Sequence, residues 1–283
     1  MPTASCSVMD DLAGRTAVIT GAASGLGRAM AERLAAEGMR LLLADIERSP
    51  LEDVAHSLSE AATDVVTQPV DVARGEDVDR LAHVAFNRFG AVDVLCNNAG
   101  VVKRARSWNL TLDDWNWVLG IDLWGVIHAV RAFVPRMLGQ AGGGHIVNTA
   151  SMSGLLPIPN LAAYSVAKAA VVALSEALQL DLDAEGAPIG VSVLCPGFIA
   201  TRITESERNR PAHLTDTAPE PEVARTTAGV EATMDASDVA EQVVEAIRTN
   251  RFWILTHGAY REVIRDRAAG IGTDARPAAP PIW

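Results

Sequence analysis

Short aliphatic runs alternate with longer helical patterns along most of this 283-residue chain. Each run is rich in Val, Ile and Leu and nearly free of polar residues, as in strands that are buried on both faces of a sheet. The patterns between the runs repeat apolar residues at helical spacing. The sequence predicts strands over residues 15–21, 40–46, 64–72, 92–100, 144–151 and 189–197, and helices over 27–38, 49–61, 75–90, 110–138 and 163–182.

This alternation predicts an α/β fold, in which a doubly wound parallel sheet is covered by helices on both faces. No linker rich in Gly, Ser or Pro divides the chain, so we expect one domain over residues 1–283. A polar segment as long as 203–234 is typical of a functional lid or an insert. The remaining segments are an N-terminal tail (1–13), a helix and a final strand (235–257), and a C-terminal helix (259–268) within a terminal region (259–283).

Composition excludes several classes of function. A net charge of −11 argues against nucleic-acid binding, which needs clustered Lys and Arg. Cys6, Cys96 and Cys195 form no disulfide or zinc spacing, the histidines are scattered, and no metal site is expected. No window of about 18 apolar residues and no secretory signal is visible, so we expect a cytoplasmic protein without a membrane partner.

A glycine-rich turn, "TGAASGLG" (20–27), joins the first strand to the first helix. Gly21, Gly25 and Gly27 permit a tight turn, and together with Ser24 and Leu26 they bring backbone N–H groups toward a pyrophosphate at the helix N-terminus. The turn therefore indicates dinucleotide binding.

The second strand ends in an acid, Asp45. Its carboxylate can accept hydrogen bonds from both ribose hydroxyls of adenosine and would repel a 2′-phosphate. The turn also has Ser24, not a cation, before Gly25. Both features favour NAD over NADP as the cofactor.

The sequence "YSVAK" puts Tyr164 and Lys168 one helical turn apart. A free tyrosine has a pKa of about 10, and a neighbouring lysine cation favours the phenolate. Tyr164 could then take the hydroxyl proton of an alcohol while a hydride leaves the carbon. Ser151, at the end of a strand, could hold the substrate oxygen.

Taken together, these motifs resemble the classical short-chain dehydrogenase/reductase family. The resemblance extends to "DV" (71–72), "NNAG" (97–100) and "CPGFIAT" (195–201), in family order. It implies a Rossmann sheet of seven parallel strands and a homotetramer or homodimer built through the two long helices. It further implies that the cofactor is bound by Asp71, Val72, Asn98, Ala99, Gly100, Tyr164, Lys168, Pro196, Gly197, Ile199 and Thr201.

Asp122 stands in the apolar helical run "GIDLWGV", on the same stripe as Val126 and Ala129, and should face inward. The resemblance implies that this position is usually Asn, the fourth catalytic residue, whose backbone carbonyl holds a relay water for the lysine. Two hypotheses remain open. Asp122 is either a working substitute, which we favour, or the sign of an altered proton relay.

The substrate is less well constrained by the sequence. The apolar segment 152–162 suggests an aliphatic or cyclic secondary alcohol of the hydroxysteroid or terpenoid-acid type. Lys103, Arg104 and Arg106 form either a solvated basic loop, which we prefer, or a rim that attracts a carboxylate. The alternatives are a 3-oxoacyl-thioester reductase and, from another class, a non-catalytic protein that senses NAD(H) or serves as a scaffold.

Two further interpretations concern residues near the motifs. Ser153 competes with Ser151 for the catalytic role, but its spacing to the tyrosine suggests that it shapes the loop. Cys96 and Cys195 are interpreted as small buried hydrophobic residues because neither has a basic partner in its motif.

Overall fold

A parallel sheet of seven strands lies at the centre of the molecule, in the order β3-β2-β1-β4-β5-β6-β7. The computed structural model describes residues 9–59, 64–219 and 233–279. The strand order reverses at β1, which pairs with β2 on one side and with β4 on the other, so that Val18 lies opposite both Leu42 and Leu95. The strands are β1 (Thr16–Thr20), β2 (Arg40–Asp45), β3 (Val65–Pro69), β4 (Val94–Asn97), β5 (Gly144–Thr149), β6 (Ile189–Cys195) and β7 (Trp253–Leu255). The predicted doubly wound fold is confirmed.

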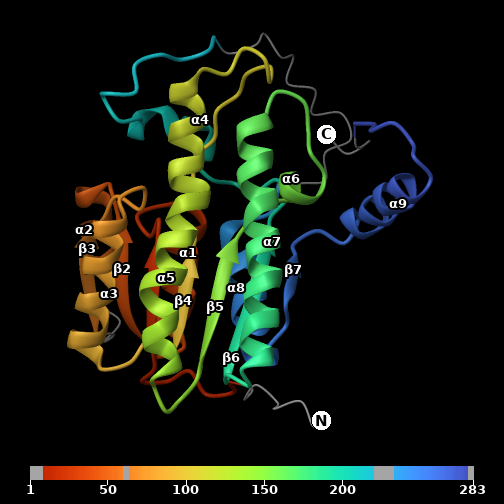
Figure 1. Cartoon of the computed structure of the whole chain (residues 1–283). Helices are drawn as coiled ribbons and strands as arrows, with labels where there is room; N and C mark the ends of the chain where they lie inside the picture. The colour runs from red at the N-terminus through yellow and green to blue at the C-terminus, as the bar shows by residue number, and fades with distance from the viewer. Residues whose placement is uncertain (1–8, 60–63, 220–232, 280–283) are drawn as a thin grey trace.

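Helices cover both faces of this sheet (Figure 1). Alternate side chains of each strand point to opposite faces, so each strand contributes to two apolar cores. One core joins the sheet to α1 (Gly25–Ala36), α2 (Arg48–Ser59) and α8 (Ala236–Thr249). The other joins it to α3 (Gly75–Phe89), α5 (Gly125–Leu138) and α7 (Ala162–Ala184).

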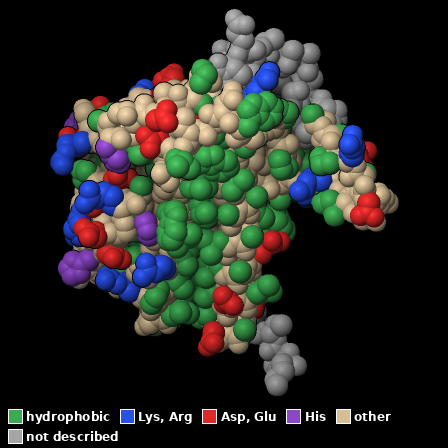
Figure 2. All heavy atoms as spheres, turned by 45° about the horizontal axis from the view of Figure 1, so that its top comes forward, with side chains coloured by type: hydrophobic (Ala, Val, Ile, Leu, Met, Phe, Trp, Pro, Cys, Tyr) green, Lys and Arg blue, Asp and Glu red, His purple; other side chains and the backbone are tan. Residues whose placement is uncertain are grey.

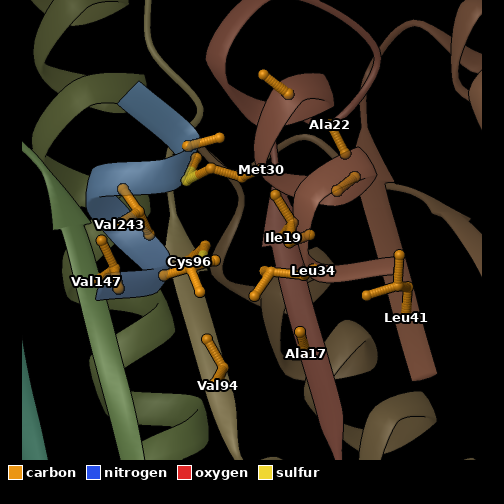
Figure 3. Packing of buried hydrophobic residues seen from close by; sticks show 14 of the residues in the cluster. Ala17, Ile19, Ala22, Met30, Leu34, Leu41, Val94, Cys96, Val147 and Val243 are labelled. Atoms are coloured by element: carbon orange, nitrogen blue, oxygen red, sulfur yellow. The ribbon is translucent and has the colours of Figure 1, made fainter. Parts of the chain in front are cut away.

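The first core shows how this alternation works. In β1, Ala17 and Ile19 belong to one core and Val18 belongs to the other. Figure 3 shows Ile19 beside Leu34 of α1, with Val243 of α8 against the neighbouring strands. These three side chains are fully buried, which fixes the first strand and helix, and therefore the turn between them, against the sheet.

The predicted helix over 110–138 is one continuous helix with a change of winding in its middle. It consists of α4 (Leu112–Leu119), a π-helical turn η1 (Gly120–Trp124) and α5. It begins with a capping box in which Thr111 and Asp114 each accept a hydrogen bond from the other's backbone N–H. Asp122 lies within the π turn, a type of distortion that often occurs at functional sites.

The same helix corrects one expectation from the sequence. By length and composition, Leu112–Leu138 is apolar enough to cross a membrane, although no such window was expected. In the fold, 44% of its apolar window is buried. Core helices of water-soluble proteins have this character too, because one face packs against a sheet.

The outer segments differ partly from the predicted boundaries. The C-terminal helix, α9 (Tyr260–Gly272), is longer than predicted and extends away from the sheet (Figure 1). The predicted lid, residues 203–234, begins with the 3₁₀ helix η2 (Ile203–Asn209). Met234, at its end, forms an isolated β-bridge with Ile199, and residues 220–232 lie outside the described residues. Residues 1–8 of the predicted tail, with Cys6, also lie outside them, as do residues 280–283.

Candidate active site

A pocket of about 300 Å³ opens beyond the carboxyl ends of the strands. It lies where the strand order reverses, which is the usual ligand site in open α/β sheets. It is lined by Ser151, which follows β5, by Tyr164 of α7 and by Asp45, the last residue of β2. The other predicted residues that line the pocket are Gly21, Ser24, Gly25, Leu26, Asp71, Val72, Asn98, Ala99, Gly100, Lys168, Pro196, Gly197, Ile199 and Thr201.

Two predicted residues, Gly27 and Asp122, are not among those that line the pocket. Gly27 packs against the turn itself, because a Cβ at this position would lie 2.0 Å from the carbonyl oxygen of Gly21. Gly21 has a φ of +68°, in the left-handed region that favours glycine. Its own Cβ would lie 2.8 Å from Cα of Ala99, so the turn needs glycine at both positions.

The start of α1 faces the pocket with no carboxylate in its first turn. Ser24 is the N-cap residue, but its side chain makes no capping hydrogen bond. The first N–H groups of the helix and the positive end of its dipole therefore suit an anion such as a pyrophosphate.

Asp45 is held at the other end of the pocket by its neighbours. Its carboxylate accepts hydrogen bonds from the backbone N–H groups of Ala23 and Glu47, each at 2.9 Å. Burial raises the pKa of Asp45, while these two hydrogen bonds act to lower it. Each oxygen keeps a further lone pair that can accept a hydroxyl hydrogen.

Arg208 of η2 reaches this end of the pocket, where no contact was predicted from the sequence. Its guanidinium pairs with Glu47 at 2.8 Å, and both residues line the pocket. Since 161 positions separate the two residues, no local pattern could have indicated the pair.

Ser151, Tyr164 and Lys168 come together at the substrate end. The Ser151 hydroxyl interacts with the Tyr164 phenol and lowers its pKa, and Nζ of Lys168 lies 5.6 Å from the centre of the phenol ring. Burial raises the pKa of Tyr164, and the Asp122 carboxylate raises it further, whereas Lys168 and Ser151 lower it. The lysine thus acts in the predicted direction, but burial outweighs it in this structure.

Lys168 is anchored from two sides inside the protein. Its Nζ donates a hydrogen bond to the carbonyl oxygen of Thr149 at 3.0 Å and lies 3.1 Å from Oδ2 of Asp122. Burial alone would lower the pKa of Lys168, but the Asp122 carboxylate and the Tyr164 phenol raise it above its usual value. Thr149 was missed from the sequence, although it lies at the end of the strand that leads to Ser151.

Asp122 is fully buried, as its place on the apolar stripe predicts. Its Oδ1 accepts a hydrogen bond from the backbone N–H of Val101 at 2.8 Å, and its Oδ2 faces Lys168. Burial raises the pKa of Asp122, while Lys168 and the Val101 N–H lower it. One oxygen of the carboxylate therefore holds the loop that follows β4 by a hydrogen bond, and the other forms the ion pair with Lys168.

The neighbouring serine and the two described cysteines have structural surroundings. The Ser153 hydroxyl shares a 2.6 Å hydrogen bond with that of Ser165, and its backbone N–H donates to Ser151 Oγ at 3.1 Å. Burial raises the pKa of both Cys96 and Cys195 to about 12, so neither thiol is activated. These contacts agree with the structural interpretations made from the sequence.

The basic residues after "NNAG" do not form one solvated loop, which corrects the preferred interpretation. Lys103 is only 4% exposed and pairs with Glu207 of η2 at 2.7 Å. Arg106 is exposed and lies over the Trp108 ring. Arg104 lines the pocket.

Comparison with known proteins gives consistent matches over most of the chain. A family model described as short chain dehydrogenase matches residues 15–212. The crystal structure of a short chain dehydrogenase/reductase from Burkholderia phymatum in complex with NAD is 40% identical, with a TM-score of 0.90 over 95% of this chain and 98% of that one.

Two curated proteins are also similar along nearly their whole lengths. The 1-deoxy-11-beta-hydroxypentalenate dehydrogenase of Streptomyces avermitilis is 37% identical over 244 residues, which make up 86% of this chain and 84% of that protein. The CLA biosynthesis dehydrogenase/reductase of Lactiplantibacillus plantarum is 33% identical over 279 residues, or 95% of this chain and 97% of that protein. With its seven-stranded parallel sheet and its glycine-rich turn, this chain belongs to the short chain dehydrogenase family.

Proposed function

We propose that this oxidoreductase uses NAD to interconvert a secondary alcohol and the corresponding ketone. The observation that carries the proposal is the convergence of Ser151, Tyr164 and Lys168 on one pocket that also reaches Asp45. The similar protein from Burkholderia phymatum was crystallised with NAD, which supports the choice of cofactor.

The residues around the pocket fit NAD. The turn at Gly21 and Gly27 leaves no room for side chains where backbone must approach a pyrophosphate, and the open helix start suits its charge. Asp45 would accept hydrogen bonds from the adenosine ribose hydroxyls and repel a 2′-phosphate. NAD bound there would supply the redox chemistry, which is the transfer of a hydride between the substrate carbon and the cofactor.

The proton follows a separate path through the protein. Tyr164 takes the alcohol proton in oxidation and returns it in reduction, and Ser151 holds the substrate oxygen beside it. Lys168, raised in pKa by its acidic partner, stays cationic at neutral pH and stabilises the phenolate. Its field acts against the burial that raises the pKa of Tyr164.

In our proposal, Asp122 does the work of the Asn expected at this position. The site needs two acceptors, one for the Val101 N–H and one for Lys168. A carboxylate supplies both, whereas an amide has only one oxygen and would turn its NH₂ group toward another donor. The π turn around Asp122 also interrupts regular helical hydrogen bonding, which suits a backbone carbonyl that holds a relay water.

The substrate end of the pocket suits an apolar molecule. It is lined by Ile158 and Leu161 of the loop before the tyrosine, by Phe198, and by Ile203 of η2. Burying hydrocarbon against such side chains favours binding by about 25 cal/mol per Å². The names of the two curated relatives, which concern pentalenate and CLA, support a hydroxylated terpenoid or an aliphatic chain as the substrate class.

We further propose that the chain assembles as a homodimer or homotetramer through its two long helices. Trp124 and Leu138 project from one of them, and Val166 and Leu180 from the other, each pair about four helical turns apart and so on one side. All four side chains are between 47% and 69% exposed. Figure 2 shows hydrophobic side chains gathered on one face of the molecule, as at an interface.

A panel of secondary alcohols tests the function and its alternatives. Steroid, terpenoid and aliphatic alcohols are supplied with NAD, and NADH formation is followed by absorbance. Turnover of at least one apolar alcohol supports the proposal. Reduction of 3-oxoacyl thioesters alone would favour a thioester reductase, and NADH binding without any turnover would favour a sensor or scaffold.

A further inference from the structure

The loop after β4, residues 101–106, forms one wall of the substrate end of the pocket. Ala105 connects this loop to the segment before Tyr164. The Ala105 N–H donates to the carbonyl oxygen of Asn160 at 3.0 Å, and Ala105 forms a β-bridge with Leu161. The ion pair between Lys103 and Glu207 ties it to η2. Arg104 lies between these two attachments.

Burial alternates along this extended segment. Val101, Lys103 and Ala105 are buried, whereas Val102 and Arg104 are partly exposed, and Val101, Val102 and Arg104 line the pocket. Successive side chains of an extended backbone point to opposite sides. Lys103 therefore points away from Arg104 and pairs with Glu207, while Arg104 lines the pocket.

Arg104 differs from the other cations of the pocket in its lack of an acidic partner. Arg202 pairs with Glu205 at 2.9 Å, Arg208 with Glu47, and Lys168 with Asp122. Within residues 9–59, 64–219 and 233–279, Arg104 has no ion pair or hydrogen bond from its side chain. Its five N–H donors are thus free for a ligand.

Charge is unevenly distributed along the pocket. The carboxylates that line it are Asp45, the last residue of β2, Glu47, which follows that strand, and Asp71, which follows β3, and all three lie at the cofactor end. Arg104 precedes Ala105, which is bridged to Leu161, and it lines the same pocket as Ile158 and Ile203. A molecule with a hydrocarbon body and one anionic group matches this arrangement.

We propose that Arg104 binds a carboxylate of the substrate and so selects hydroxy acids over neutral alcohols. This inference rests on the proposed alcohol dehydrogenase function. Arg104 acts as a specificity residue that orients the acid end, and a guanidinium can hold a carboxylate through two parallel hydrogen bonds. Lys103 takes no part, because Glu207 already neutralises it.

The first test compares each hydroxy acid with its own methyl ester. Ricinoleate and lithocholate, each a secondary alcohol, are oxidised with NAD alongside methyl ricinoleate and methyl lithocholate. We expect Arg104→Gln to lower kcat/KM for the acids by about 10- to 100-fold, mainly through KM, as for the loss of a charged hydrogen bond. The esters should change by less than about threefold.

Arg106→Gln is the matched control, because Arg106 carries the same charge two residues away but stands exposed over Trp108. It should leave the kcat/KM values of both acids and esters unchanged. Equal losses for acid and ester in Arg104→Gln, or equal losses in both Gln variants, would overturn the proposal. NADH affinity should be unchanged in every variant.

A binding measurement separates failure of this inference from failure of the proposed function. Decanoate and decanamide are titrated into the full-length chain with and without NADH, by calorimetry. Stronger binding of decanoate that is lost in Arg104→Gln upholds the anion site even if no alcohol is oxidised. Equal binding of the two probes to the wild type, or decanoate binding unchanged by the substitution, refutes it.

Discussion

Replacing Asp122 by Ala should destabilise the protein strongly, because it leaves Lys168 without a counterion in the interior. Both side chains are buried, with 3% exposure for the lysine and none for the acid. The substitution also removes the acceptor of the Val101 N–H. A remaining interaction, the hydrogen bond to the Thr149 carbonyl oxygen, does not neutralise the cation.

The size of the effect follows from the geometry of the pair. At 3.1 Å and an effective dielectric constant of about 20, two unit charges attract by about 5 kcal/mol. Breaking a buried ion pair by removing one partner typically costs about 3–5 kcal/mol. We therefore expect Asp122→Ala to lower the free energy of unfolding by about 3–5 kcal/mol.

Removing both charges should be less harmful than removing one. In Asp122→Leu/Lys168→Met, no charge is left buried, and well-packed apolar replacements of ion pairs are often close to neutral. The two single variants and the double variant form a cycle whose coupling energy we expect to be about 2 kcal/mol or more. Asp122→Asn, which keeps one acceptor, should fall between Asp122→Ala and the wild type.

The assay is equilibrium unfolding in urea, followed by tryptophan fluorescence without NADH. All variants are measured at one protein concentration, since assembly would make stability concentration-dependent. A loss below about 1 kcal/mol for Asp122→Ala, or single-variant losses that simply add in the double variant, would refute the buried ion pair.

Three further predictions concern the cofactor and the proton path. Gly27→Ala should weaken NADH binding more than tenfold in a fluorescence titration, because the new Cβ would lie 2.0 Å from a backbone oxygen. Gly139→Ala is the control and should leave NADH binding unchanged, because its nearest contact would be at 3.5 Å. Asp45→Ala should lower the NAD/NADP ratio of kcat/KM by about tenfold, in proportion to one lost charged hydrogen bond, and an unchanged ratio would count against its role. The Asp122 carboxylate raises the pKa of Tyr164, so Asp122→Asn should lower that pKa. The rise of kcat/KM with pH in alcohol oxidation should then move to lower pH. A pH profile identical to that of the wild type would show that the charge of Asp122 has no effect on the base.

The sheet and its main helices could be predicted from the sequence because each depends on a local pattern. Apolar runs such as the one from Leu41 to Ala44 leave few choices other than a buried strand. The glycine-rich turn could also be predicted, because its glycines follow a strand and open a helix, although the contact of Gly21 with Ala99 joins segments that are distant in the sequence. The inward direction of Asp122 followed from helical spacing alone.

Other features depend on contacts between distant segments and have no local pattern. Lys103 and Arg104 are both basic, and only the position of Glu207, 104 residues further on, decides that one is neutralised and the other is not. The π turn at Asp122 likewise lies against α7 and the loop at Val101, contacts that no local pattern indicates. The effect of burial on Tyr164 could not be weighed against Lys168 until the walls of the pocket were known.

The most direct test of the central claim is the activity of Tyr164→Phe on an alcohol that the wild type oxidises. Phenylalanine keeps the ring but has no hydroxyl to accept and return the substrate proton. We predict that NADH formation falls by at least about 100-fold, the usual range for a lost general acid–base, while NADH affinity changes by less than about threefold. Activity close to that of the wild type in this variant, with cofactor binding intact, would contradict the account.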